Sequence, residues 1–222
     1  MNNPVALQVI VTTVLLTLED GELRVVLTPA QGEVNTSQLG LFDESIKGSE
    51  DVNLEHTVRL SLERRAAIGD VYIEQLETFS GAVPGVPETQ TIQICYIALA
   101  PEAKVMPAIR RSTQLRTLSP DALPSLPYHG NKAVAAGVAR LRLMGQWSIM
   151  PAYLLDREFT ISQLNAVYDA VVGTTSFGES FRRKILKADV LVPVGARHTS
   201  GATKKSEHYS IRPGAFETGI RL

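Results

Sequence analysis

The sequence predicts an α+β protein of two domains, and three observations support this prediction. The first half alternates strand-length apolar segments with turns and contains one amphipathic helix. The last third contains two short helices with capping signatures, followed by two strands that flank a basic loop. Charge divides in the same way, because residues 1–105 carry a net charge of −9 and residues 106–222 carry +8. We therefore expect one domain over residues 1–148 and a second over residues 152–213.

The composition is ordinary for a globular protein, with 44% hydrophobic and 20% charged residues among 222. The single cysteine, Cys95, lies in an apolar segment and is expected to be a small buried hydrophobe. Residues 5–18 are apolar, but no lysine or arginine precedes them and no small-residue cleavage site follows. They favour a core strand over a signal peptide or a membrane span, and we expect a cytoplasmic protein without a membrane partner.

The pattern of apolar residues gives the elements of the first domain. A helix is expected at 53–67, capped by Asn53, because one apolar residue in every four forms a stripe along it. The other expected elements are strands at 5–18, 23–27, 71–78 and 91–99 and a helix at 131–143 with Ala135 facing inward. Residues 28–50 and 101–127 are expected to be irregular, and Trp147 is expected to anchor the core where the domains join.

The C-terminal segment has the pattern of a winged helix-turn-helix. Thr160 and Gln163 form a capping box that starts a first helix, which Gly173 ends. Ser176 and Glu179 form a second capping box, and the helix they start continues to residue 188 with its apolar side on Phe177, Phe181, Ile185 and Leu186. Two helices joined by a short glycine-containing turn make a helix-turn-helix. Strands at 190–194 and 209–212 then flank a polar, basic loop that is typical of a wing.

This module is rich in cationic residues, with 8 Lys/Arg against 3 Asp/Glu over residues 176–212. A helix in the major groove needs such charge against two rows of phosphates, and a wing can contact the neighbouring backbone. The residues expected to contact double-stranded DNA are Ser176, Arg182, Arg183, Lys184, Lys187, Arg197, His198, Lys204 and Lys205. An ordinary solvated helix face is the alternative, and the helix-turn-helix spacing together with the basic loop disfavours it.

Several segments resemble the Nudix-related transcriptional regulators, whose NadQ-type members control NAD biosynthesis. The resembling segments are residues 157–164, Val167-Tyr168, 181–186, 70–79, 96–101, 122–124 and Tyr128-His129. The resemblance implies a Nudix-like α/β/α sandwich followed by a C-terminal winged helix-turn-helix. It also implies a repressor of genes of NAD or pyridine-nucleotide metabolism that responds to ADP-ribose, NAD or a related nucleotide. A homodimer is expected, because one recognition helix gives limited affinity and two-fold operators match two-fold proteins.

The catalytic motif of Nudix hydrolases is altered in this chain. That motif, Arg-Glu-apolar-x-Glu-Glu-x-Gly-apolar, lies on a helix whose carboxylates hold Mg²⁺ against a diphosphate. Aligned from the following strand, residues 60–68 place Arg64 and Arg65 at the metal-binding glutamates and Ala67 at the glycine.

A register shifted by one residue recovers Arg59 and Glu63 but loses the second metal glutamate and puts Ser61 at an apolar position. In both registers positive charge replaces carboxylates. The sequence therefore predicts no catalytic residue, no metal site and no enzyme activity.

Loss of catalysis does not abolish nucleotide binding, because a guanidinium matches the geometry of a phosphate. Arg64 and Arg65 are therefore candidate effector-binding residues, and a solvated helix face is the alternative. Two rival functions remain: a Nudix-type nucleoside-diphosphate hydrolase with a divergent motif, and a scaffold whose basic module binds another protein.

Overall fold

The computed structural model describes residues 6–31, 38–46, 53–82, 89–173, 178–198 and 205–215. The chain divides into two compact units. The first consists of Met1–Thr17 and Arg24–Val138, and the second of Leu18–Leu23 and Ala139–Leu222. None of the described helices is long and apolar enough to cross a membrane.

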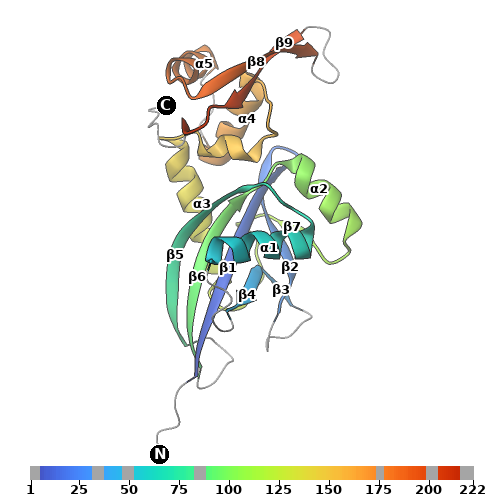
Figure 1. Cartoon of the computed structure of the whole chain (residues 1–222), viewed down its shortest axis with the longest axis vertical. Coiled ribbons are helices and arrows are strands. Elements are labelled where there is room, and N and C mark those ends of the chain that lie inside the picture. Colours follow the sequence, from blue (N-terminus) through green and yellow to red (C-terminus); the bar gives the residue numbers. More distant parts are fainter. Residues whose placement is uncertain are drawn as a thin grey trace, which may run out of the picture. The chain divides into compact units, whose positions relative to one another are not determined.

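A mixed sheet of seven strands forms the centre of the first unit (Figure 1). The strands follow the order β3-β2-β1-β6-β5, with β4 paired to β1 and β7 paired to β2. Their bounds are β1 Ala6–Glu19, β2 Glu22–Pro29, β3 Leu39–Gly40, β4 Phe42–Ser45, β5 Tyr72–Ala82, β6 Thr89–Leu99 and β7 Arg116–Leu118. Strands β1 and β6 are parallel and central, whereas β5 and β4 pair antiparallel with them.

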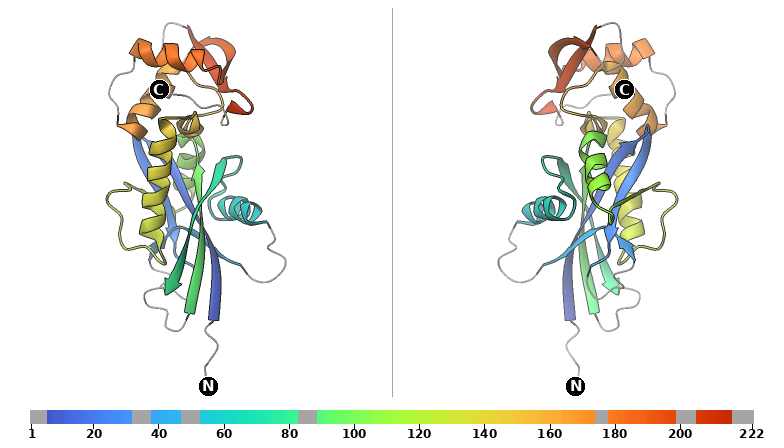
Figure 2. Two further views of the ribbon diagram at one scale, coloured as in Figure 1. Left: turned by 90° about the vertical axis from the view of Figure 1, so that its left-hand side faces the viewer. Right: turned by 90° about the vertical axis from the view of Figure 1, so that its right-hand side faces the viewer.

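Helices cover both faces of this sheet (Figure 2). On one face α1 (Leu54–Ala66) and α2 (Glu102–Arg111) share a core cluster with Val11 and Leu15 of β1. On the other face lies α3 (Gly130–Gly145), where a methyl group at Gly137 would lie 3.3 Å from Val14 Cγ1. Neighbouring residues of a strand point to opposite faces, so α1 and α3 sandwich the sheet. The predicted α+β class and Nudix-like sandwich are confirmed.

Helix α1 forms as its sequence predicts. The Asn53 side chain accepts a hydrogen bond from the His56 amide at 3.0 Å, which caps the first turn. Val58, Leu62 and Ala66 are buried along one stripe. At the other end Ala67 takes the left-handed conformation, with φ 54° and ψ 37°, and the helix ends there.

Two hydrogen bonds close the end of α1. The Ala67 amide donates to Glu63 O at 2.9 Å, and the Ile68 amide donates to Leu62 O at 3.3 Å. The first of these is the bond of the αL motif, in which glycine is the preferred residue at the left-handed position. Alanine at this position carries a steric cost, because its Cβ crowds the backbone in the left-handed region.

We expect Ala67→Gly to raise the free energy of unfolding by about 1 kcal/mol, since glycine removes that cost. Urea denaturation followed by circular dichroism measures the change. Ala135→Gly is the matched control, because Ala135 is exposed in the interior of α3, where glycine costs about 1 kcal/mol. A loss of stability in Ala67→Gly would contradict the assigned helix end.

The second unit contains the elements of a winged helix-turn-helix. Its elements are η1 Met150–Leu154, α4 Ile161–Val172, α5 Gly178–Lys187, β8 Leu191–His198 and β9 Lys205–Ile211. The capping box of Thr160 and Gln163 is present, and Gly173 ends α4 in the left-handed conformation. Tyr168 and Phe181 lie in one core cluster, with their ring centroids 5.1 Å apart. The predicted winged helix is confirmed.

Some sequence predictions were wrong. Residues 28–50 contain β3 and β4, and residues 101–127 contain α2 and β7. Strand β4 has one buried apolar residue, Phe42, followed by two acidic residues. It therefore lacks the alternation of apolar and polar residues that predicts a strand. Helix α2 includes Pro107, which lacks an amide hydrogen and is unfavourable inside a helix. The proline therefore argued against a helix, although Val105 and Ala108 form its buried face.

Three side chains that were predicted to be buried are exposed. Trp147 was predicted to anchor the core, but it is 46% exposed, and Leu186 of α5 is 39% exposed. Ala135 of α3 is also exposed, because Ala133, Val134 and Val138 form the buried face of that helix. The predictions for Ser176 and Phe177 fall outside the described residues.

Candidate effector site and candidate nucleic-acid interface

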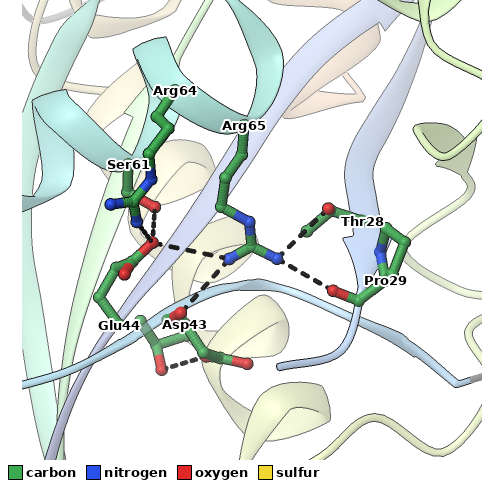
Figure 3. Close-up of polar contacts among 8 residues, drawn as sticks. Thr28, Pro29, Asp43, Glu44, Ser61, Arg64 and Arg65 are labelled. Atoms are coloured by element: carbon green, nitrogen blue, oxygen red, sulfur yellow. Dashed lines mark hydrogen bonds and ion pairs between the residues drawn. The ribbon is translucent and has the colours of Figure 1, made fainter. Parts of the chain in front are cut away.

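The C-terminal half of α1 presents two adjacent arginines that have different surroundings (Figure 3). The Glu44 carboxylate of β4 accepts hydrogen bonds from Ser61 Oγ at 2.7 Å and from Arg64 Nη2 at 2.8 Å. The Arg64 side chain is 66% exposed, whereas that of Arg65 is 7% exposed. Arg64 can therefore meet a ligand from solvent while it stays bonded to Glu44.

Arg65 links α1 to two strands of the sheet. Its Nη2 donates to Pro29 O at 3.0 Å and to Thr28 Oγ1 at 3.3 Å, and its Nη1 donates to Asp43 O at 3.3 Å. The guanidinium also lies 5.3 Å from the centroid of the Phe42 ring. Burial lowers the pKa of Arg65 from its ordinary value, and the Glu44 and Asp43 carboxylates oppose that shift. Direct contact between Arg65 and an effector stays a prediction.

The helix end favours one of the two registers for the altered Nudix motif. The motif requires apolar residues two positions before the first metal glutamate and directly after the glycine. In the first register these are Leu62 and Ile68, which are 0% and 1% exposed. The glycine position is Ala67, which has the left-handed conformation that favours glycine. Arg64 and Arg65 thus stand where hydrolases carry metal-binding glutamates.

These residues do not fit a divalent cation. Two guanidinium groups repel Mg²⁺, which needs several oxygen ligands. Within the described ranges, no group of three or more His, Cys, Asp or Glu side chains is placed to hold a metal ion. The Glu44 carboxylate, the acidic group beside this helix face, is already bonded to Ser61 and Arg64.

Asp43, beside this site, is a buried acid. Thr12 Oγ1 donates to Asp43 Oδ1 at 2.6 Å, and the residue is 6% exposed. Burial raises the pKa of Asp43 to about 6, although the Thr12 hydrogen bond and Arg65 oppose the rise, and Glu44 adds to it. A raised pKa means that the folded protein holds this proton more tightly than the unfolded chain.

The stabilisation from this protonation is complete below pH 3.8 and disappears as the pH rises through about 6. We expect Asp43→Asn to be more stable than the natural chain at pH 7.5, by on the order of 2 kcal/mol. The two-unit rise amounts to about 3 kcal/mol, and a buried amide without an acceptor offsets about 1 kcal/mol. Urea denaturation at pH 4.5 and pH 7.5 measures both proteins. A difference that did not shrink at the lower pH would contradict the burial of the ionised acid.

Helix α5 presents the predicted basic surface of the second unit. Phe181 and Ile185 are each 0% exposed and hold the helix to its core. The predicted DNA-binding residues on the helix are all exposed, namely Arg182, Arg183, Lys184 and Lys187. The structure brings these four together on one helix, whereas Ser176 lies outside the described residues.

The wing is a hairpin of β8 and β9, and a third segment joins it, because Phe159 and Tyr209 form a bridge. Arg197 of β8 forms an ion pair with Glu158, and Lys205 of β9 is exposed. His198 is described only by its backbone in β8, and Lys204 falls outside the described residues. Glu158 lies in the family-like segment 157–164, but the sequence did not predict its pairing with Arg197.

Three comparisons with known proteins bear on these two sites. Residues 151–211 match the family model described as the NrtR DNA-binding winged helix domain. The chain is 21% identical over 179 residues to the "ADPR responsive transcriptional repressor NtrR" of Acinetobacter baylyi, covering 80% of this chain and 71% of that protein.

Among solved structures, the chain is similar to Shewanella oneidensis NrtR in complex with a 27mer DNA. The TM-score is 0.85 at 25% identity, with 96% of this chain and 97% of that chain covered. The Nudix domain of the same NrtR in complex with ADP-ribose matches with a TM-score of 0.50 at 26% identity, over 61% of this chain and 89% of that chain. Sequence motifs, fold and comparisons agree: the chain combines a Nudix-like fold with a C-terminal segment, residues 151–211, that matches the NrtR DNA-binding winged helix domain.

Proposed function

We propose that this chain is a transcriptional repressor that binds duplex DNA through α5 and the β8–β9 wing and responds to ADP-ribose. The observation that carries the proposal is the row of exposed cations on α5, in a segment that matches the NrtR winged helix. An NrtR with the same fold was solved with DNA, and its Nudix domain was solved with ADP-ribose. Residues 1–148 would sense the effector, and residues 152–213 would bind the operator.

We further propose that the regulated genes belong to NAD or pyridine-nucleotide metabolism. The chain would act as a homodimer, because one recognition helix gives limited affinity and a two-fold protein matches a two-fold operator. DNA from upstream of such genes, compared with a shuffled duplex in a gel-shift titration, tests sequence-specific binding. Equal affinity for both duplexes would favour the scaffold alternative.

The effector would bind without a metal ion. The exposed guanidinium of Arg64 supplies positive charge for a diphosphate at the position where a hydrolase holds its cation. Since Arg64 and Arg65 replace metal-binding carboxylates, bound ADP-ribose would not be hydrolysed.

We expect Arg64→Ala to weaken ADP-ribose binding by about tenfold, the loss of one charge-assisted contact. Isothermal titration calorimetry in EDTA measures the affinity of the full chain. Arg59→Ala is the matched control, because Arg59 lies on the same helix and pairs with Glu55 in an exposed ion pair. If both variants weaken ADP-ribose binding equally, the effect comes from net charge rather than from Arg64. Mg²⁺-dependent hydrolysis of ADP-ribose by the natural chain would favour the hydrolase alternative.

A further inference from the structure

A chain of buried side-chain hydrogen bonds runs from β4 across β1 to β6. Thr12 Oγ1 donates to Asp43 Oδ1 at 2.6 Å, and Gln93 Nε2 donates to Thr12 Oγ1 at 2.7 Å. Thr12 and Gln93 are each 0% exposed, within the central strands β1 and β6. The threonine hydroxyl is donor to one neighbour and acceptor from the other, so the direction of the whole chain is fixed.

One end of this chain lies at the Nudix-motif arginine. Phe42 belongs to the core on the α1 face and contacts the Arg65 guanidinium, so the next residue, Asp43, points to the opposite face. The backbone oxygen of Asp43 accepts from Arg65 Nη1 at 3.3 Å. A displacement of α1 therefore moves β4, and with it the carboxylate that Thr12 holds.

The other end lies at the start of α3. Gln93 Oε1 accepts from the His129 amide at 3.1 Å, and His129 O accepts from the Ala133 amide at 2.9 Å in the first turn. The His129 ring also lies 5.5 Å from the ring of Phe79 on β5. Helix α3 begins in the first unit, and its residues from Ala139 onward belong to the second unit.

We propose that Thr12 and Gln93 are the positioning residues that couple effector binding at α1 to the helix leading into the DNA-binding unit. Direct hydrogen bonds join the Asp43 carboxylate, Thr12, Gln93 and the His129 amide on the α3 side of the sheet, and the Asp43 backbone oxygen connects this chain to Arg65 of α1. Apolar residues would fill the same interior without the need to satisfy buried polar atoms. A network of this kind has two defined states, bonded or broken, which effector binding can bias.

This inference rests on the proposed function, and its test separates the two. The measured quantity is the ratio of the Kd for operator DNA with saturating ADP-ribose to the Kd without it, in the full chain. Thr12→Val removes the hydroxyl at nearly constant volume, and Thr12→Ser keeps it as the matched control. We expect a change of at least about fivefold in the natural chain and in Thr12→Ser. In Thr12→Val the ratio is expected to fall toward one, while the Kd for each ligand alone changes less than about threefold.

A second variant covers the case in which Thr12→Val fails to fold. Gln93→Met keeps the Thr12–Asp43 hydrogen bond but removes the acceptor of the His129 amide. The hydrogen-exchange rate of the His129 amide, measured with and without ADP-ribose, tests the same coupling in the absence of DNA. ADP-ribose is expected to change this rate in the natural chain but not in Gln93→Met.

If ADP-ribose changes the Kd for operator DNA as strongly in a folded variant as in the natural chain, Thr12 and Gln93 do not couple the two sites. That result would leave the proposed repressor function intact. If ADP-ribose does not change the Kd of the natural chain for operator DNA, both the proposed function and the coupling role of Thr12 and Gln93 are wrong.

Discussion

Arg65→Met is expected to lower the free energy of unfolding by about 3 kcal/mol, the lower end of the cost of breaking a buried ion pair, here the pair of Arg65 Nη1 with Glu44 Oε1 at 4.0 Å. The substitution keeps an unbranched apolar chain beside Phe42 but removes the donors to Pro29 O, Thr28 Oγ1 and Asp43 O. Those acceptors would lose the charged donor that Arg65 supplies, which adds to the loss. Urea denaturation of the full chain near pH 7 measures the effect.

Arg64→Met is the matched control on the same helix turn. Its side chain is 66% exposed, and an exposed ion pair such as the one with Glu44 contributes at most about 1 kcal/mol. If the two substitutions cost the same, Arg65 would not be the link between α1 and the strands that its contacts indicate.

The double substitution Arg182→Ala/Arg183→Ala is expected to weaken operator binding by about 100-fold, because each arginine that contacts DNA contributes about 1–3 kcal/mol. Both side chains are exposed on α5, while Phe181 and Ile185 hold the helix to its core, so the fold is expected to survive. The slope of log Kobs against log salt should also fall in magnitude by about 2, one counterion for each lost phosphate contact. Fluorescence anisotropy with a labelled duplex measures both quantities.

Arg110→Ala/Arg111→Ala removes the same charge from α2, where both arginines are exposed. It serves as the control for net charge and is expected to change the affinity by less than about threefold. If both double variants bind DNA as the natural chain does, α5 is not the recognition helix.

Much of the fold could be predicted from the sequence because local signals were strong. The Thr160–Gln163 capping box and Gly173 defined both ends of α4, and the apolar stripe defined α1. The elements that were missed depend on tertiary contacts: β4 is stabilised by pairing with β1, and α2 packs with α1 in one cluster despite Pro107. Trp147, two residues after α3, was predicted to be buried but is exposed, because large aromatic residues are buried only on average.

The candidate effector site was predicted only in part. Sequence alone identified Arg64 and Arg65 but left two registers open, and the left-handed Ala67 at the helix end favours one of them. It could not separate the exposed arginine from the buried one, since that difference depends on how α1 lies against β2 and β4. Thr12 and Gln93 could not be singled out from the sequence, because β1 and β6 also contain the buried polar residues Thr13, Thr17 and Thr91. Their partner Asp43 lies in the strand that was not predicted.

We propose that one chain binds operator DNA at α5 and the wing and that this binding changes when ADP-ribose occupies the Nudix-like unit. The most direct measurement is the Kd of the full chain for a duplex from upstream of an NAD-metabolism gene, taken in EDTA with and without ADP-ribose. We expect tighter binding to this duplex than to a shuffled one and at least about a fivefold change in Kd with ADP-ribose, with the nucleotide recovered intact. An unchanged Kd, or hydrolysis of the nucleotide when Mg²⁺ replaces EDTA, would rule out an ADP-ribose-responsive repressor.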